Sequence, residues 1–183
     1  NEYPGLQNTP TESDKYNIGW KWALETCVQY FDFWKNDSWR PIEAEIVKGE
    51  VIYEDDNIRI LWKSKLDLII ETDVGIRPMD HKTQKQKSDK LKLNNQFIGQ
   101  CIITGTREII INEIGFQTSL KPEEKFDRKH ISYTADNILE WQSETLPTVA
   151  YELLASHESE YWPPNYTHCE TKYGKCAFCG VCE

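Results

Sequence analysis

The sequence predicts an α/β fold in which helices flank a central mixed β-sheet. The order of its elements leads to this prediction: an amphipathic helix, three strand-like segments, a second helix, a strand and a long helix. Elements in this order bury their apolar faces when helices cover a sheet. The chain has 183 residues, of which 39% are hydrophobic, and this length suffices for one domain with a substantial core.

The N-terminal part is expected to form an arm and then a helix. Residues 1–18 are mostly polar and contain two prolines, so they predict an arm without regular structure. From Trp20 to Trp34 the apolar residues recur with helical spacing. Cys27 lies on the apolar side of this helix, and a cysteine in such a place is usually a small core residue. The same reasoning places Cys101 in the core.

Three strands are predicted next. Residues 42–53 alternate between polar and apolar, and residues 58–70 form a long strand after a polar turn. Residues 75–83 form the third strand. The segment 71–75 between the last two strands is polar and ends in glycine, so it predicts a turn that joins them as a hairpin.

The remaining elements alternate between helix and strand. They are a helix over residues 91–105, a strand over 108–116, a charged loop over 119–128, a short strand over 130–133 and a long helix over 134–157. Pro147 is expected to interrupt the long helix because proline has no N–H to donate. We divide the chain into the arm 1–18, a core 19–160 and a Cys-rich segment 161–183 of the same domain.

The hairpin brings acidic side chains and a lysine together. Asp80 and Lys82 point the same way because side chains alternate along a strand, and folding places Asp67 close to both. Two neighbouring carboxylates form a site for a hard divalent cation such as Mg²⁺ or Mn²⁺. With a lysine beside them they suit metal-assisted hydrolysis of phosphodiester bonds. The alternative is that these side chains are simply solvated.

The charge distribution bears on the partner. The net charge of −9 is unlike the basic footprint of most nucleic-acid binders. Residues 81–92, however, hold five lysines against one acid, directly after the candidate site. We expect Lys85, Lys87 and Lys90 to follow a DNA backbone; a solvated loop without a partner is the alternative. No apolar run has the length of a membrane span and no secretory leader is present, which predicts a cytoplasmic protein with no membrane partner.

These motifs resemble the PD-(D/E)XK nuclease superfamily, and in particular its RecB-like branch, which includes Cas4-like enzymes and phage exonucleases. In that branch an Asp on one strand is followed by Asp-x-Lys-Thr on the next and by a Gln-x-x-x-Tyr helix. The chain has Asp67, Asp80-His81-Lys82-Thr83 and Gln96 in these places. Gln100 stands where the family has tyrosine, and the early histidine of many members is absent before His81.

The resemblance implies roles for these residues. Asp67, Asp80 and the main-chain carbonyl of His81 would be metal ligands, with an upstream acid in support. Glu45 is the first candidate for that acid and Glu43 the second, although an exposed strand face explains both more readily than a ligand role does. Lys82 would position the attacking water, and Gln96 would contact the substrate phosphate or this water. Gln100 would join the lysines in contacting DNA.

Four cysteines lie close together near the end of the chain, namely Cys169, Cys176, Cys179 and Cys182. Their spacing, in a chain without an export signal, indicates a metal or iron–sulfur site rather than disulfides. A Cys₄ zinc site is chemically acceptable. The RecB-like resemblance, through Asn165, Cys169 and the Tyr-Gly-x-Cys-x-Phe pattern, implies a [4Fe–4S] cluster that staples this segment to the body. We favour Cys179 as the fourth ligand over Cys27 or a residue outside the chain.

Together these features predict a DNA nuclease, and by resemblance an exonuclease, that acts in phage or bacterial recombination or DNA processing with possible protein partners. The alternative is an inactive DNA-binding or scaffold module that keeps the fold and the metal staple. A zinc-tailed binding protein without a nuclease site is the third reading, and it requires the hairpin match to be accidental.

Overall fold

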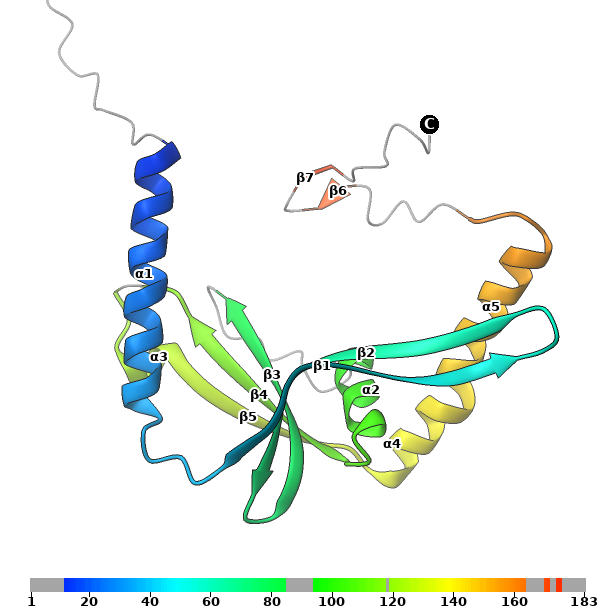
Figure 1. Ribbon diagram of the computed structural model, residues 1–183, viewed down its shortest axis with the longest axis horizontal. Helices are drawn as coiled ribbons and strands as arrows, with labels where there is room; N and C mark the ends of the chain where they lie inside the picture. Colours follow the sequence, from blue (N-terminus) through cyan, green and yellow to red (C-terminus); the bar gives the residue numbers. More distant parts are fainter. Residues whose placement is uncertain (1–11, 85–93, 118, 164–169, 172–173, 176–183) are drawn as a thin grey trace, which may run out of the picture. The chain divides into compact units, whose positions relative to one another are not determined.

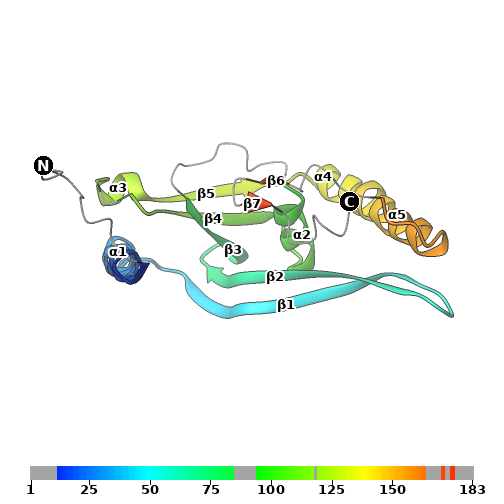
Figure 2. The same ribbon diagram turned by 90° about the horizontal axis from the view of Figure 1, so that it is seen from above.

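The structure is a computed structural model, and it describes residues 12–84, 94–117, 119–163, 170–171 and 174–175. It confirms the α/β class, with a five-stranded sheet in the order β1-β2-β3-β4-β5 and helices alongside (Figures 1 and 2). The sheet is mixed, because β3 runs parallel to β4 whereas β2–β3 and β4–β5 are antiparallel. The chain divides into two compact units, residues 1–50 with 62–138 and residues 51–61 with 139–183.

Helix α1 (Glu12–Phe33) begins earlier than the predicted start at Trp20. The prediction was late because residues 12–17 are mostly polar and carry no apolar period. Near its end, Tyr30 and Phe33 lie against the ring of Phe126 from β5, with ring centroids 5.5 and 5.6 Å apart. Aromatic contacts at this spacing fasten the last turns of the helix to the sheet.

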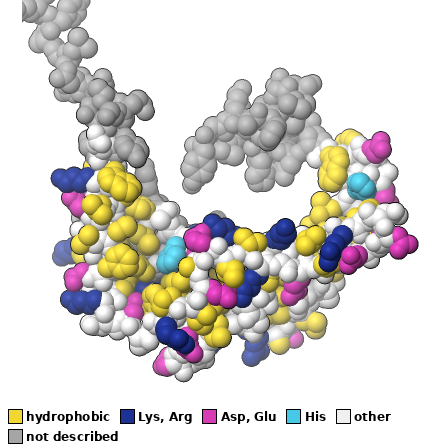
Figure 3. All heavy atoms as spheres, in the orientation of Figure 1, with side chains coloured by type: hydrophobic (Ala, Val, Ile, Leu, Met, Phe, Trp, Pro, Cys, Tyr) yellow, Lys and Arg dark blue, Asp and Glu magenta, His cyan; other side chains and the backbone are white. Residues whose placement is uncertain are grey.

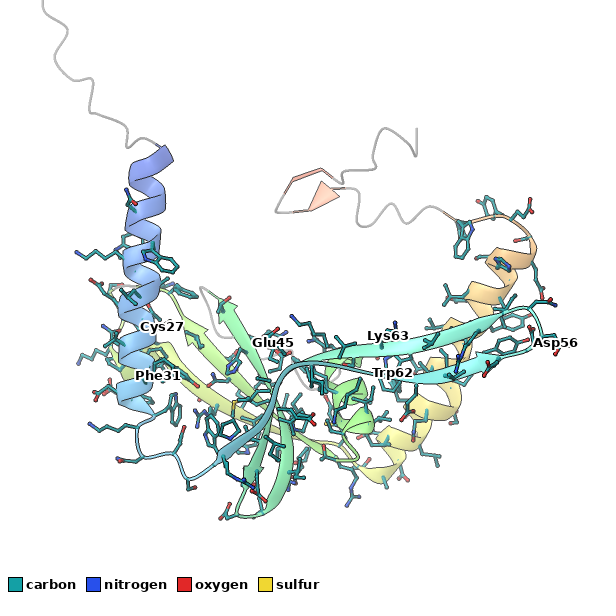
Figure 4. The ribbon with its side chains drawn as sticks, viewed as in Figure 1. Cys27, Phe31, Glu45, Asp56, Trp62 and Lys63 are labelled. Atoms are coloured by element: carbon teal, nitrogen blue, oxygen red, sulfur yellow. The ribbon has the colours of Figure 1, made fainter. Side chains whose placement is uncertain are left out.

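The prediction that Cys27 belongs to the core is wrong, because its side chain is exposed (Figure 4). Thr26 is buried and Tyr30 is partly buried one turn later, so the covered face of α1 runs through these residues. Phe31 is 71% exposed, and hydrophobic side chains gather on the face of the helix that is turned toward the viewer in Figure 3. Periodicity shows that a helix has an apolar side but does not show what covers it.

Strands β1 (Arg40–Glu54), β2 (Arg59–Thr72) and β3 (Gly75–Gln84) confirm the three predicted strands. Asp55 shapes the first turn, where its Oδ1 accepts the backbone N–H groups of Asn57 and Ile58, each at 2.8 Å. The second turn needs glycine, since Gly75 has φ +116°. The pairing of β2 with β3 puts Leu68 opposite Met79 and thereby sets the register of the site.

Helix α2 (Asn95–Ile103) is capped by Asn94, whose Oδ1 accepts the N–H of Gln96 at 2.8 Å. It is followed by β4 (Glu108–Gly115), α3 (Pro122–Lys125) and β5 (Phe126–Ser132). The predicted loop over 119–128 is therefore wrong from residue 122 onward. Strand β5 already begins at Phe126 within this segment. The prediction missed it because a single buried aromatic residue among charged residues gives no alternating pattern.

The predicted long helix is interrupted, but at residues 141–145, just before Pro147 rather than at it. Helix α4 (Ala135–Glu140) continues through a π-helical turn over Trp141–Thr145 into α5 (Leu146–Glu158). Proline cannot donate to the preceding turn, and the wider π turn accommodates this before α5 resumes. Two short strands, β6 (Glu170–Thr171) and β7 (Gly174–Lys175), pair antiparallel.

The core lies on both faces of β3 and β4. Ile70, Met79 and Ile110 form a buried cluster with Trp39 and Leu68 on one face. Phe97 and Cys101 of α2 are fully buried, and α2 contacts β3 and β4. Strand β4 is buried at each position from 109 to 113, as expected for a strand covered on both faces. Within the described residues, the helices are too short or too polar to cross a membrane.

Candidate functional site

The centre of the candidate site is Asp80, a carboxylate in β3 that is 1% exposed. Its Oδ2 lies 2.7 Å from Nζ of Lys82, which follows two residues later on the same face of the strand. Its Oδ1 accepts the side-chain amides of Gln96 at 2.8 Å and Gln100 at 3.3 Å. Burial of a charge is costly unless it is paired and hydrogen-bonded, and Asp80 meets both conditions.

Helix α2 supplies both amides because Gln96 and Gln100 are one turn apart and share a helix face. Oε1 of Gln96 also accepts from Nζ of Lys82 at 3.4 Å, so this amide bridges the two members of the ion pair. The same ammonium lies 5.4 Å from the ring centroid of Phe97. The predicted grouping of Asp80, Lys82 and Gln96 is therefore present in the structure.

Asp67 reaches the site from the neighbouring strand β2. Continuing the β2–β3 register by one pair beyond Leu68 and Met79 places Asp67 opposite Asp80 on the same face. Oδ2 of Asp67 accepts the backbone N–H of His81 at 2.9 Å. This bond fixes the Asp67 carboxylate beside the strand that carries Asp80, as the hairpin predicted.

His81 anchors β3 on the opposite face of the sheet. Its Nδ1 lies 2.7 Å from Nδ2 of Asn112, which fits a neutral ring that accepts the amide proton. Burial lowers the pKa of His81, and the carboxylates of Asp67 and Asp80 oppose this shift. The ring of His81 therefore faces away from the Asp80 side chain, and its main-chain carbonyl remains a predicted ligand.

Asn112, Tyr30 and Arg128 are polar residues that support His81, and they were not predicted from the sequence. Nδ2 of Asn112 also donates to the hydroxyl of Tyr30 at 2.9 Å, and Nη2 of Arg128 donates to the same hydroxyl at 3.1 Å. Asn112 is fully buried within β4. Its position directly after Ile109-Ile110-Ile111 was the available signal, because a polar residue in a buried strand needs a partner.

A second buried charge pair accompanies the site. Glu113 of β4 is 1% exposed, and its Oε2 lies 2.9 Å from Nζ of Lys129 in β5. The β3–β4 register pairs Glu113 with Lys82, which places both pairs on the same face of the sheet. Sequence reasoning did not single out these residues, and the buried acid in an apolar strand was again the signal.

Glu45 lies in β1 (Figure 4) and forms an ion pair with Lys65 of β2. Its φ of 52° is in the left-handed region, which is unusual for a residue with a Cβ and redirects the strand locally. The nearby Glu45 carboxylate raises the pKa of Lys65. Glu43 pairs with Lys48 at 3.1 Å. A metal-ligand role for Glu45 or Glu43 stays a prediction.

The arrangement has the donor chemistry of a hard-cation site. Asp67 and Asp80 provide carboxylate oxygens on one face, which Mg²⁺ and Mn²⁺ prefer. In the part of the chain that the structure describes, no three His, Cys, Asp or Glu side chains are grouped to hold a metal. A cation here would therefore depend on the two carboxylates together with main-chain, amide or water oxygens.

Other predicted residues have separate outcomes. Gln100, predicted to contact DNA, is 1% exposed and is therefore not available to DNA in this structure. Cys101 is buried as predicted, and burial raises the pKa of its thiol to about 12. Lys85, Lys87 and Lys90 and the cysteines Cys169, Cys176, Cys179 and Cys182 lie outside the described residues.

The chain was compared with protein families, with curated proteins and with solved structures. Neither a scan against protein-family models nor a search of curated proteins finds a match. Among solved structures, the chain is similar to the crystal structure of SSO0001. The two share 15% sequence identity over 87% of this chain and 67% of that chain, with a TM-score of 0.47.

Proposed function

We propose that this chain is a divalent-metal-dependent DNA nuclease, and specifically an exonuclease of phage or bacterial DNA recombination or processing. The observation that carries the proposal is the buried Asp80 carboxylate, which contacts Lys82 and Gln96 on one face of the sheet. Asp67 stands in register on the neighbouring strand. The cytoplasm of a bacterial or phage-infected cell is the proposed location.

In the proposed reaction Asp67 and Asp80 would hold Mg²⁺ or Mn²⁺, which would supply charge stabilisation and an activated water for phosphodiester hydrolysis. Lys82 is 34% exposed in its side chain, so its ammonium can reach a phosphate at the surface while it remains beside Asp80. The positive charge of the Lys82 ammonium would stabilise the negative charge that develops on the phosphate. Gln96 orients Lys82 through its amide oxygen.

The rest of the proposal concerns segments outside the described residues. Lys85, Lys87 and Lys90 would follow the DNA backbone, because phosphate contacts by lysine supply most sequence-independent affinity. The four C-terminal cysteines would hold a [4Fe–4S] cluster, or Zn²⁺ as the alternative. Metal analysis of anaerobically purified protein separates these outcomes, since the cluster contains iron and sulfide. Protein partners in a recombination or processing complex belong to the same proposal.

A second candidate is an inactive DNA-binding or scaffold module. Two observations favour it: the net charge of −9, and the lack of a third grouped metal-ligating side chain within the described ranges. Such a module would bind DNA or a partner protein without cutting. Asp80, Lys82 and Gln96 would then serve only to stabilise α2 on the sheet.

Cleavage of linear DNA with single- and double-stranded ends in Mg²⁺ or Mn²⁺ tests the proposal. Asp80→Asn keeps the side-chain shape but removes the charge, and Lys82→Met removes the ammonium. Each is expected to lower the cleavage rate at least about a hundredfold, as removal of a group that stabilises transition-state charge does. Lys35→Met is the control, since the partner of Lys35 among the described residues is exposed Asp32.

The outcomes separate the two candidates. Undiminished cleavage by Asp80→Asn or Lys82→Met would sink the assignment of the site. A wild-type protein that binds DNA but cuts neither kind of end in either metal would favour the inactive module. Circular dichroism of each variant shows whether a loss of activity reflects a loss of folding.

A further inference from the structure

Gln100 connects the elements that form the candidate site. It is 1% exposed, and its Nε2 lies 3.3 Å from Oδ1 of Asp80 in β3 and 3.3 Å from the main-chain oxygen of Lys65 in β2. One amide on α2 therefore reaches both strands of the hairpin. The two acceptors occupy the two protons that a side-chain amide can donate.

The oxygen of the same amide is the unusual atom. Oε1 of Gln100 is buried and has no hydrogen-bond partner among the described residues. Reversing the amide would place this oxygen against the oxygens of Asp80 and Lys65, so the two acceptors fix its orientation. Buried polar atoms are nearly always bonded, and an exception such as this one needs an explanation, of which a bound water or ion is the one that brings a donor.

The described hydrogen-bond donors around Asp80 already have partners. The amide of Gln96 donates to Asp80, and Nζ of Lys82 contacts both Asp80 and Gln96. A water molecule held beside Asp80 is the simplest remaining donor. Mg²⁺ and Mn²⁺ bring such waters with them, because these cations keep part of their hydration shell when few protein ligands bind them.

We infer that Gln100 is a positioning residue of the cation site, which fixes Asp80 through its amide nitrogen and accepts a hydrogen bond from a cation-held water through Oε1. The inference rests on the cation site of the proposed function. Partners beyond the direct ligands commonly change metal affinity by 10- to 100-fold.

Binding of Mn²⁺ to the full chain without DNA, measured by titration calorimetry at pH 8, tests this role. Gln100→Leu removes the donor and the acceptor at similar volume, and we expect its Mn²⁺ affinity to fall about 10- to 100-fold. Cys101→Ala, at a fully buried apolar position on the same helix, should lower stability but leave the Mn²⁺ affinity unchanged, and it is the control for a purely structural role. Gln142→Leu, at an exposed position, is the control and should bind as the wild type does.

The comparison of Gln100→Leu with Cys101→Ala distinguishes positioning from a purely structural role. Unchanged Mn²⁺ binding by folded Gln100→Leu, or an equal loss of binding in Cys101→Ala, overturns the inference. If Gln100→Leu does not fold by circular dichroism, Gln100→Met decides, and an affinity equal to that of the wild type overturns the inference. The expected loss of affinity without DNA cleavage supports the role of Gln100 while refuting the nuclease; a wild type that binds no Mn²⁺ refutes both.

Discussion

Arg128 should be among the most costly side chains to remove, because it joins α1 to the sheet behind the candidate site. Its side chain is 9% exposed, and Nη1 lies 2.8 Å from Oδ2 of Asp37. The guanidinium lies over the ring of Trp34 at 3.7 Å from the centroid. It also donates to Oδ1 of Asn112 at 3.3 Å and to the hydroxyl of Tyr30.

The magnitude follows from these contacts. Removing one partner of a buried ion pair costs about 3–5 kcal/mol. Asp37 keeps 21% of its side-chain surface exposed, so water partly solvates the remaining charge and the lower end applies. The cation–π contact adds about 1 kcal/mol. Because such contributions are not additive, we expect Arg128→Met to lower the free energy of unfolding by about 3 kcal/mol.

Urea unfolding followed by tryptophan fluorescence measures this loss, and hydrogen exchange locates it. Amides in the last turns of α1 should exchange faster in Arg128→Met, since the helix loses its attachment there. Arg59→Met is the matched control, because Arg59 and Glu54 form a pair with both side chains more than half exposed. Exposed pairs contribute about 0–1 kcal/mol. If both substitutions cost the same, the account of Arg128 as an anchor is refuted.

Two further predictions concern titratable groups. Burial lowers the pKa of His81 below 6.5 in the folded protein, so the unfolded chain binds more protons than the folded chain in this range. The stability that comes from the neutral ring is therefore fully present above pH 6.5. It is lost as the pH falls from 6.5 toward the lowered pKa. Unfolding free energies at pH 7.5 and 5.5 should therefore differ less in His81→Gln, and an equal difference would contradict this. Iodoacetamide at pH 8 should modify exposed Cys27 in the native protein. It should modify buried Cys101, whose pKa is about 12, only after denaturation. Peptide mass spectrometry of both samples measures this difference.

Local patterns sufficed to predict the hairpin that carries the site. The turn ends in Gly75, whose positive φ other residues rarely adopt, and alternation fixed which side chains share a face. The spacing of Asp80 and Lys82 then followed from strand geometry alone. Asp67 could be placed because a hairpin with a known turn has a determined register.

The missed features depend on contacts between distant parts of the chain. Asn112 bonds Tyr30 across 82 positions, and Arg128 reaches the same hydroxyl across 98. No local period encodes such partners. The same limit explains Cys27, since the apolar side of α1 was visible in sequence whereas the aromatic anchor at Phe126 was not.

Gln100 stands where the nuclease pattern that the sequence resembles has tyrosine, and the two side chains differ in what they can donate. Tyrosine has one hydroxyl proton to donate, whereas a glutamine amide has two and also a carbonyl oxygen. Here the two donations go to Asp80 and to the main chain of Lys65. Gln100 therefore ties both strands of the β2–β3 hairpin to α2.

The ion pair between Lys82 and Asp80 bears on how the proposed nuclease would use its lysine. The Lys82 ammonium, 2.7 Å from Oδ2 of Asp80, offsets much of the charge of this carboxylate, and a divalent cation bound there would do the same. When a cation shares this carboxylate, the attraction that holds Lys82 there is weakened, since two positive charges then compete for one negative charge. Gln96 contacts both members of the pair and would retain Lys82 nearby through its amide oxygen. More of the Lys82 charge would then be available to a phosphate when the cation is bound, which would couple metal binding to substrate binding.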